Sequence, residues 1–349
     1  MEEYNKQTSE SDQSSNKRRM ETRSMAKKRA KVQSAKVQST KTQTTKTQTT
    51  KSARIQVSNL FVIMGMNYFK KFDKVLSDIW KTYNRADYEK WVKMIQNEDT
   101  IPATICSKKQ LELYEKKYSG LGKIKDAITS ASKMDNAHDI TKIQSKLIEQ
   151  IKSTLPSKKD GQSSQNSHSQ DAEKIAKLIT NIGNTGYGIK QEDNVIAHFE
   201  KIIKKPVKST QKLYNHSLGD LYGIRWSLVG KVDGLTSDLE VVEIKNRMKG
   251  LFGELRSYEK PQIMTYLRLS GSQKGYMVEC YRKKDDANNV SVDMGIVNVE
   301  YEEGYFECDV IPAIDKFTRF FSDFIKNDSM KRMVIEGKQD ELYEIFQDY

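Results

Sequence analysis

The chain has 349 residues, of which 36% are hydrophobic and 30% charged, so it is long enough for two modest domains and able to bury a core. No run approaches the roughly 18 apolar residues of a membrane span, and the polar N-terminal region lacks the apolar segment of a secretory signal. The cysteines lie far apart without CxxC spacing, which favours a reducing, intracellular setting and speaks against zinc and iron–sulfur sites: they are Cys106, Cys280 and Cys308.

The net charge of +12 is concentrated at one end of the chain. Residues 1–54 contain 14 Lys and Arg against 5 Asp and Glu, a net charge of +9, which leaves +3 for the remainder. The rest of the chain is therefore close to neutral, and a groove for nucleic acid there would be a local patch.

Residues 1–54 are polar and repetitive. A five-residue repeat places lysines at regular intervals, at Lys31, Lys36, Lys41, Lys46 and Lys51. Such a segment buries too little surface to offset its ordering entropy, so we predict a disordered basic tail. Two basic clusters, at 17–19 and 27–29, suit a bipartite nuclear import signal or an arm that binds phosphate; a solubilising tail is the alternative.

Residues 55–155 carry apolar residues at helical spacing, most clearly over 61–80, and we predict a helical region there. Its later helices are expected over 84–97, 107–117 and 138–153. Asp139 is the expected N-cap of the last helix. We interpret the aromatic residues of this region as packing residues rather than as a platform for nucleobases. The polar stretch 156–170, rich in Ser and Gln, is the expected linker.

From residue 171 onwards helical and β-prone stretches alternate, which predicts an α/β domain over 171–349. The expected helices lie over 171–182, 189–204, 258–269, 311–326 and 338–347. The expected strands lie over 222–232, 239–246, 275–282 and 290–301. Pro261 suits the first turn of the helix that interrupts the strands, where its missing N–H costs nothing.

Charged residues stand at the end of one predicted strand and inside the next. Asp233 follows the first strand, and Glu243 and Lys245 lie two apart in the second, so they point to one face. Paired carboxylates can hold Mg²⁺, which polarises a phosphate and lowers the pKa of an attacking water; a lysine can orient or deprotonate that water. The pattern indicates phosphodiester hydrolysis, and an ordinary charged strand face is the alternative.

Residues on two predicted helices support the interpretation that this is a site of phosphodiester hydrolysis. Gln262 and Tyr266 lie four apart on one face of the helix that follows the strands. Upstream, Glu192 stands near the start of the helix predicted over 189–204 and can supply a third carboxylate; a first-turn acid favoured by the helix dipole is the alternative. His198 lies six residues further on, so the two do not share a face and at most one of them is a ligand.

Together these motifs resemble the RecB-like branch of the PD-(D/E)XK nuclease superfamily, and within it the lambda-exonuclease (YqaJ viral recombinase) group. The resemblance covers about residues 173–285 and rests on G-x-x-x-E at 188–192, G-x-V-D-G at 230–234, E-I-K-x-R at 243–247 and Q-x-x-x-Y at 262–266. It implies a restriction-endonuclease-like α/β fold, a mixed sheet flanked by helices, preceded here by the helical region and the basic tail.

The resemblance also implies roles for the residues of these motifs. The expected ligands of Mg²⁺ or Mn²⁺ are Glu192, Asp233, Glu243 and the backbone carbonyl of Ile244. The expected catalytic residues are Asp233, Glu243 and Lys245. The residues expected to position the substrate are Gln262, Tyr266 and Arg247. No iron–sulfur cluster is expected, because the cysteines for one are absent.

The implied activity is that of a divalent-metal-dependent DNA nuclease, an exonuclease by its nearest likeness, in recombination, repair or the genome processing of a virus or mobile element. The expected partners are DNA, further copies of the chain and a single-strand-binding or annealing protein. The basic tail would suit the nucleus or a viral replication site. The alternative is a catalytically silent protein that keeps the fold for nucleic-acid binding or scaffolding.

Overall fold

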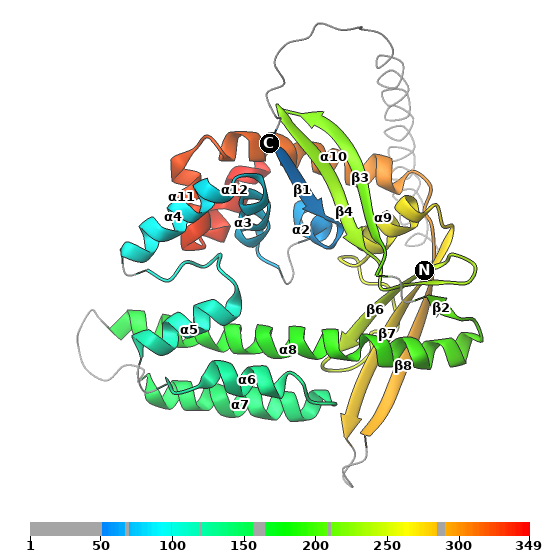
Figure 1. Ribbon diagram of the computed structural model, residues 1–349, viewed down its shortest axis with the longest axis horizontal. Helices are drawn as coiled ribbons and strands as arrows, with labels where there is room; N and C mark the ends of the chain where they lie inside the picture. The colour runs from blue at the N-terminus through cyan, green and yellow to red at the C-terminus, as the bar shows by residue number, and fades with distance from the viewer. Residues whose placement is uncertain are drawn as a thin grey trace, which may run out of the picture.

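The computed structural model describes residues 51–66, 70–98, 100–118, 121–155, 165–208, 211–284 and 290–349. Nearly all of the predicted basic tail and most of the predicted linker, residues 1–50 and 156–164, lie outside the described residues. The described part is a mixed α/β structure in which helices flank a mixed sheet (Figure 1), as the sequence predicted.

The strands form a three-stranded and a five-stranded sheet. In chain order they are β1 (Ser52–Gln56), β2 (Val207–Lys208), β3 (Leu213–Leu221), β4 (Ile224–Lys231), β5 (Gly234–Thr236), β6 (Val241–Arg247), β7 (Lys274–Lys284) and β8 (Val290–Glu300). In the small sheet, β4 pairs in parallel with β1 and antiparallel with β3. The larger sheet has the order β2-β5-β6-β7-β8, and β6 with β7 is its parallel pair. The four predicted strands correspond to β4, β6, β7 and β8.

The helices are, in chain order, η1 (Val57–Asn59), α2 (Leu60–Ile63), α3 (Phe72–Tyr83), α4 (Arg85–Asn97), α5 (Ser107–Lys117), α6 (Ile124–Ala131), α7 (Ala137–Thr154), α8 (Gln165–Ile203), α9 (Lys260–Ser270), η3 (Phe306–Val310), α10 (Ile311–Phe324), α11 (Asp328–Glu336) and α12 (Gln339–Gln347). The helices predicted over 84–97, 107–117, 138–153, 258–269, 311–326 and 338–347 are confirmed, with Pro261 in the first turn of α9. No described helix combines the length and the apolar character needed to cross a membrane.

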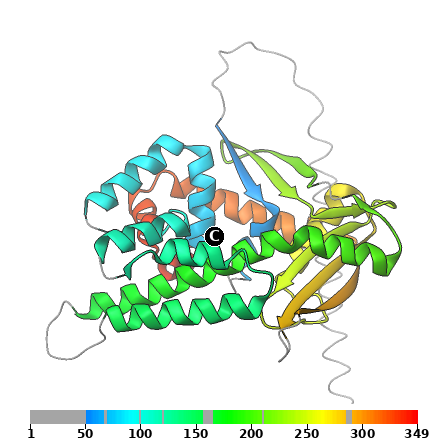
Figure 2. The same cartoon turned by 60° about the horizontal axis from the view of Figure 1, so that its bottom comes forward.

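The two faces of β6 meet different helices, because successive side chains of a strand point to opposite sides. Val242 and Ile244 pack against α8, which passes across this sheet (Figure 2). Glu243 and Lys245 point the other way and reach a side chain of α9. Helix α9 is the crossover between the parallel strands β6 and β7, so the chain order itself brings it over this face.

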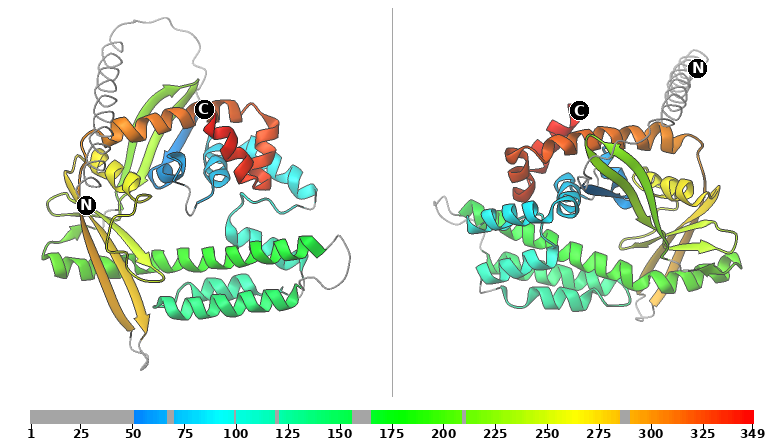
Figure 3. Two further views of the ribbon diagram at one scale, coloured as in Figure 1. Left: turned by 180° about the vertical axis from the view of Figure 1, so that it is seen from behind. Right: turned by 45° about the horizontal axis from the view of Figure 1, so that its top comes forward.

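Helices α3 and α4 lie near the C-terminal helices α10, α11 and α12 (Figure 3), and aromatic side chains of the core pack between them. The ring of Phe72 in α3 lies 4.7 Å, centroid to centroid, from Phe346 in α12, and Trp226 of β4 lies 5.2 Å from Phe321 of α10. Phe72 and Trp80 are fully buried, which confirms their interpretation as packing residues. The core thus includes residues from both sides of the predicted linker, so packing does not follow the predicted division into a helical region and a nuclease domain.

The described chain begins with a strand where the sequence predicted the end of the tail and the start of a helical region. Ala53 and Ile55 are buried and alternate with exposed neighbours, the period of two that a strand requires. The prediction was wrong because the helical region was taken to start at residue 55, although the helical spacing of apolar residues begins only after this short alternating run. The helical pattern over 61–80 is likewise divided between α2 and α3.

The two helices predicted between residues 171 and 204 are one helix, α8. The glycines between the two predicted helices serve close packing. A Cβ at Gly183 would lie 2.3 Å from Gln144 Nε2, and one at Gly186 would lie 2.4 Å from Ser132 Oγ. The absence of side chains here lets α6 and α7 approach α8, and the packing offsets the low helix propensity of glycine.

Smaller details also differ from the prediction. The N-cap of α7 is Asn136, whose side chain accepts a hydrogen bond from the Asp139 N–H, so the assignment of Asp139 as the cap was wrong. Strand β3 was not predicted, because its mostly exposed, polar residues lack an apolar alternation. Helix α11 was not predicted either, although Asn327 caps it.

Gly230 of β4 lies where the strand passes between two packed side chains. A Cβ at this position would lie 2.6 Å from Tyr266 Cε1 and 2.6 Å from Val57 Cγ2. We expect Gly230→Ala to lower the free energy of unfolding by about 1–3 kcal/mol, because both side chains must move. Urea unfolding followed by circular dichroism measures this change.

Gly188→Ala is the matched control for this variant. A Cβ at Gly188 meets nothing within 4 Å, and alanine favours the helix in which this residue lies. The control should be as stable as the parent or more stable by up to about 1 kcal/mol. Parental stability in Gly230→Ala would show that the close approach at β4 does not exist.

Candidate active site

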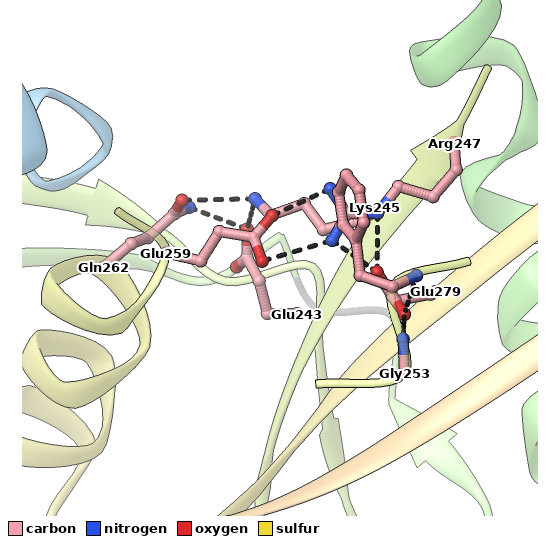
Figure 4. A network of polar contacts seen from close by, with 8 residues as sticks. Glu243, Lys245, Arg247, Gly253, Glu259, Gln262 and Glu279 are labelled. Carbon is pink, nitrogen blue, oxygen red and sulfur yellow. Dashed lines mark hydrogen bonds and ion pairs between the residues drawn. The ribbon is translucent and has the colours of Figure 1, made fainter. Parts of the chain in front are cut away.

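Three side chains form a hydrogen-bonded triangle between β6 and α9. Lys245 Nζ lies 2.7 Å from Glu243 Oε1 and 3.2 Å from Gln262 Oε1. Gln262 Nε2 donates to Glu243 Oε1 at 2.7 Å. Figure 4 shows the side chains converging from the strand and the helix. The Gln262 amide accepts from the lysine and donates to the glutamate, so it fixes both.

Asp233 lies in the connection between β4 and β5, beside the edge of β6. Its Oδ2 accepts a hydrogen bond from the Ile244 N–H at 2.7 Å. Strand β5 pairs with β6 at Val241 and Val242, before Ile244 is reached. Because the N–H and C=O of one strand residue point to the same side, the Ile244 carbonyl faces the same edge as Asp233. The structure thus places the expected ligands Asp233 and Ile244 next to each other.

Burial controls the ionisation of this site. Burial, reinforced by the charge of Asp233, raises the pKa of Glu243 to about 8. Burial also raises the pKa of Asp233, against the opposing effects of the Ile244 N–H and Lys245. Burial by itself would lower the pKa of Lys245, but the charge and hydrogen bond of Glu243, together with the charges of Asp233 and Glu259, outweigh burial and raise the pKa. The site therefore favours protons on its acids and a charged lysine.

Tyr266 lies one helical turn after Gln262 and is 2% exposed. Burial, and then the charge of Glu243, raises the pKa of this phenol. The phenol therefore keeps its proton at neutral pH and can act only through hydrogen bonding and packing. Its ring packs against Gly230 at the bottom of the site.

Glu192 approaches Asp233 from the opposite layer. It lies well inside α8, so a helix-dipole role as a first-turn acid is ruled out. Its Oε2 accepts a hydrogen bond from Gln211 Nε2 at 3.4 Å. Burial, and then the charge of Asp233, raises the pKa of Glu192, so the two acids are close enough to interact. His198 is exposed and, six residues on, lies on another side of α8.

Arg247, expected to position the substrate, is held by two buried acids. Its guanidinium nitrogens lie 2.8 Å from Glu259 Oε1 and 2.6 Å from Glu279 Oε1. Both acids are at most 3% exposed, and neither was predicted from the sequence. The signal for Glu279 was a single acid within the apolar run of β7; Glu259 stands immediately before α9.

The carboxylates of this site fit a divalent cation. Glu243 Oε2 is buried without a hydrogen-bond partner, whereas the other oxygen of the same carboxylate has two. Within the described residues, no three His, Cys, Asp or Glu side chains are grouped closely enough to enclose a metal ion. Mg²⁺ commonly binds through one or two carboxylates and keeps several waters, a requirement that Glu243 and Asp233 can meet.

No protein-family model matches the chain, and no curated protein matches it. Among solved structures, it is similar to an alkaline exonuclease (LHK-Exo) from Laribacter hongkongensis, with 15% identity, a TM-score of 0.32, and coverage of 59% of this chain and 92% of that one. The same exonuclease in complex with dAMP has 16% identity, a TM-score of 0.31 and the same coverage of 59% and 92%. A protein named SSO0001 has 14% identity, a TM-score of 0.29, and coverage of 54% and 88%. At these TM-scores the similarity assigns no activity to the chain.

We predict that binding of Mg²⁺ or Mn²⁺ displaces a proton from the site. A cation requires ionised carboxylates, and Glu243, with a pKa of about 8, is largely protonated at pH 7. Affinity should therefore rise with pH by up to about tenfold per unit and level off above the pKa. Calorimetric titration in two buffers of different ionisation enthalpy counts the protons released. An affinity that does not change between about pH 6.5 and pH 8 would contradict the prediction.

Proposed function

We propose that this protein is a divalent-metal-dependent DNA nuclease of the PD-(D/E)XK superfamily, in its RecB-like, lambda-exonuclease (YqaJ) group. The Glu243 carboxylate carries the proposal: one oxygen is bound by Lys245 and Gln262, and the other is buried without a partner. Asp233, held by the Ile244 N–H, supplies a second acid at the same strand. A buried acceptor that faces no donor is costly in a folded protein, and a bound cation would remove that cost.

Each residue of the site has a role in this proposal. Bound Mg²⁺ or Mn²⁺ would polarise the scissile phosphate and lower the pKa of the attacking water. Its ligands would be Asp233, Glu243 and the Ile244 carbonyl. Glu192, the third expected carboxylate, would have to move closer to join them, because no three acids are grouped closely enough to enclose a metal ion in the described part of the chain. Lys245, whose pKa is raised beside Glu243, stays cationic. In that form it orients the water and offsets the negative charge that grows on the phosphate in the transition state.

The residues of α9 position this set. Gln262 holds the Lys245 ammonium and the Glu243 carboxylate at fixed places. Tyr266, uncharged and buried, supports the strand behind them. Arg247 connects β6 to the start of α9 through Glu259, and so sets where the helix lies over the strand. These residues would place the substrate by placing the groups that contact it.

The proposal includes a biological setting that rests on the sequence resemblance. We propose that the substrate is DNA, that digestion starts from an end, and that the protein acts in recombination, repair or viral or mobile-element genome processing. Further copies of the chain and a single-strand-binding or annealing protein are the proposed partners. The basic residues 1–54 would carry the protein to the nucleus or to a viral replication site, or contact phosphate there.

Digestion of end-labelled linear DNA and of circular DNA, with and without Mg²⁺ or Mn²⁺, tests the proposed activity. We expect metal-dependent loss of linear DNA and resistance of closed circles. Asp233→Ala and Lys245→Ala should each reduce the rate by about 100-fold or more, because one removes a cation ligand and the other removes transition-state charge stabilisation.

Asp238→Ala is the control for these variants. Asp238 is an exposed acid beside β5 that pairs with Lys205 at 2.6 Å, outside the site, so its removal should leave the rate unchanged. Equal activity in the parent, Asp233→Ala and Lys245→Ala proteins would reject the assignment. DNA binding without cleavage in any divalent metal would favour the catalytically silent alternative.

A pair of variants on α8 distinguishes the two candidates for the third ligand. Glu192 interacts with Asp233, whereas His198 is exposed on another side of the helix. We expect Glu192→Gln to weaken Mn²⁺ binding by about tenfold or more, and His198→Gln to leave it unchanged. Calorimetric titration of both proteins with Mn²⁺ measures the difference. The reverse order of effects would assign the ligand to His198.

A further inference from the structure

The segment between β6 and α9 is fixed to the sheet by one buried carboxylate. Glu279 Oε2 accepts hydrogen bonds from the backbone N–H groups of Phe252 at 3.0 Å and of Gly253 at 2.7 Å. The other oxygen of Glu279 binds Arg247. Glu279 is fully buried, and it is the register partner of Lys245 in the parallel strand pair. The backbone at Phe252 is therefore held beside the candidate active site.

This rigid backbone presents an aromatic ring to solvent. Phe252 is 46% exposed, among the most exposed large apolar residues of the described chain. The guanidinium carbons of Arg247 and Arg256 each lie 4.5 Å from the centre of its ring. Both guanidinium groups contact this one ring, and we call the three side chains the stack.

The stack runs from the buried site towards solvent. The side chain of Arg247 is 12% exposed and is held by Glu259 and Glu279, whereas that of Arg256 is 40% exposed and pairs with Glu254. The Arg247 guanidinium group is already paired with two acids, so it does not need Phe252 to hold its position. An exposed ring between charged side chains, on a backbone held by two hydrogen bonds beside a candidate site, can serve as a binding residue.

We propose that Arg247, Phe252 and Arg256 form a nucleobase-stacking site, which receives a base of the DNA strand next to the scissile phosphate. This inference rests on the proposed nuclease function. Bases stack on guanidinium planes and on aromatic rings whatever their sequence. The exposed part of the Phe252 ring and the half-exposed guanidinium group of Arg256 supply such surfaces, and Arg256 adds attraction for the backbone phosphate. The site would hold a strand end in register without reading its sequence.

A fluorescent base tests the stack without cleavage. Duplexes with 2-aminopurine at one of the terminal positions are titrated with the full chain in Ca²⁺ and no Mg²⁺. We expect the parent protein to change the fluorescence of the base, and Phe252→Ala to lose that change and to bind about tenfold more weakly. Phe252→Tyr should retain both signals because it keeps the ring. Arg256→Gln should reduce both. Thermal unfolding of each variant confirms that it folds.

Tyr222→Ala is the matched control, because Tyr222 is another exposed aromatic residue, 45% exposed, in the turn between β3 and β4. Tyr222→Ala should bind the duplex as tightly as the parent protein does and cause the same change in 2-aminopurine fluorescence. Parental behaviour of Phe252→Ala would overturn the inference. So would equal affinity for a duplex whose terminal nucleotide is abasic, since the contact would then be to phosphate alone.

Cleavage of the same duplexes by the parent protein in Mg²⁺ separates this inference from the proposed function. Cleavage by the parent with unchanged fluorescence in Phe252→Ala would reject the stack and leave the nuclease standing. A fluorescence change that Phe252→Ala abolishes, without cleavage by the parent, would reject the nuclease and support a base-binding site. A parent that neither cleaves nor alters fluorescence would reject both.

Discussion

The Glu243 carboxylate is 3% exposed, and an acid at that depth needs partners or a proton. Strand β6 and helix α9 supply partners for one oxygen, through Lys245 and Gln262, and none for the other. The remaining arrangement follows from this constraint. Helix α9 lies over β6 because it is the crossover between the parallel strands β6 and β7. Asp233 reaches the edge of β6 as a hydrogen-bond acceptor, so it supplies no donor to Glu243.

The charge balance under α9 points the same way. On this side of the sheet the described residues bring four carboxylates to two cations: Asp233, Glu243, Glu259 and Glu279 lie with Lys245 and Arg247. At full ionisation the excess of two negative charges equals the charge of one divalent cation. A buried ion-pair network gives little net stability by itself, because desolvation offsets much of the attraction. A bound divalent cation would balance this excess of charge, as the proposed function requires.

The sequence predicted the parts that depend on local pattern. From the sequence alone, Glu243 and Lys245 could be placed on one face of a strand, because the strand period is local. Gln262 and Tyr266 could likewise be placed on one face of a helix. The predictions that failed concern residues whose packing or ion-pair partners are distant in sequence. The gap predicted between residues 182 and 189 was wrong because α6 and α7, which pack against the glycines there, are distant in sequence. The ion pairs of Arg247 were not predicted because its acids lie 12 and 32 residues away.

The most distant of these partnerships connects the first described strand to the site. Strand β1 pairs with β4, whose Gly230 touches Val57, just after β1, on one side and Tyr266 on the other. Tyr266 in turn lies on the helix that holds Gln262 against Lys245. Pairing between residues so far apart in sequence closes a long loop, and the packing of Val57 and Tyr266 around Gly230 helps to offset the entropic cost of that closure. The N-terminal part of the described chain is therefore structurally part of the candidate active site.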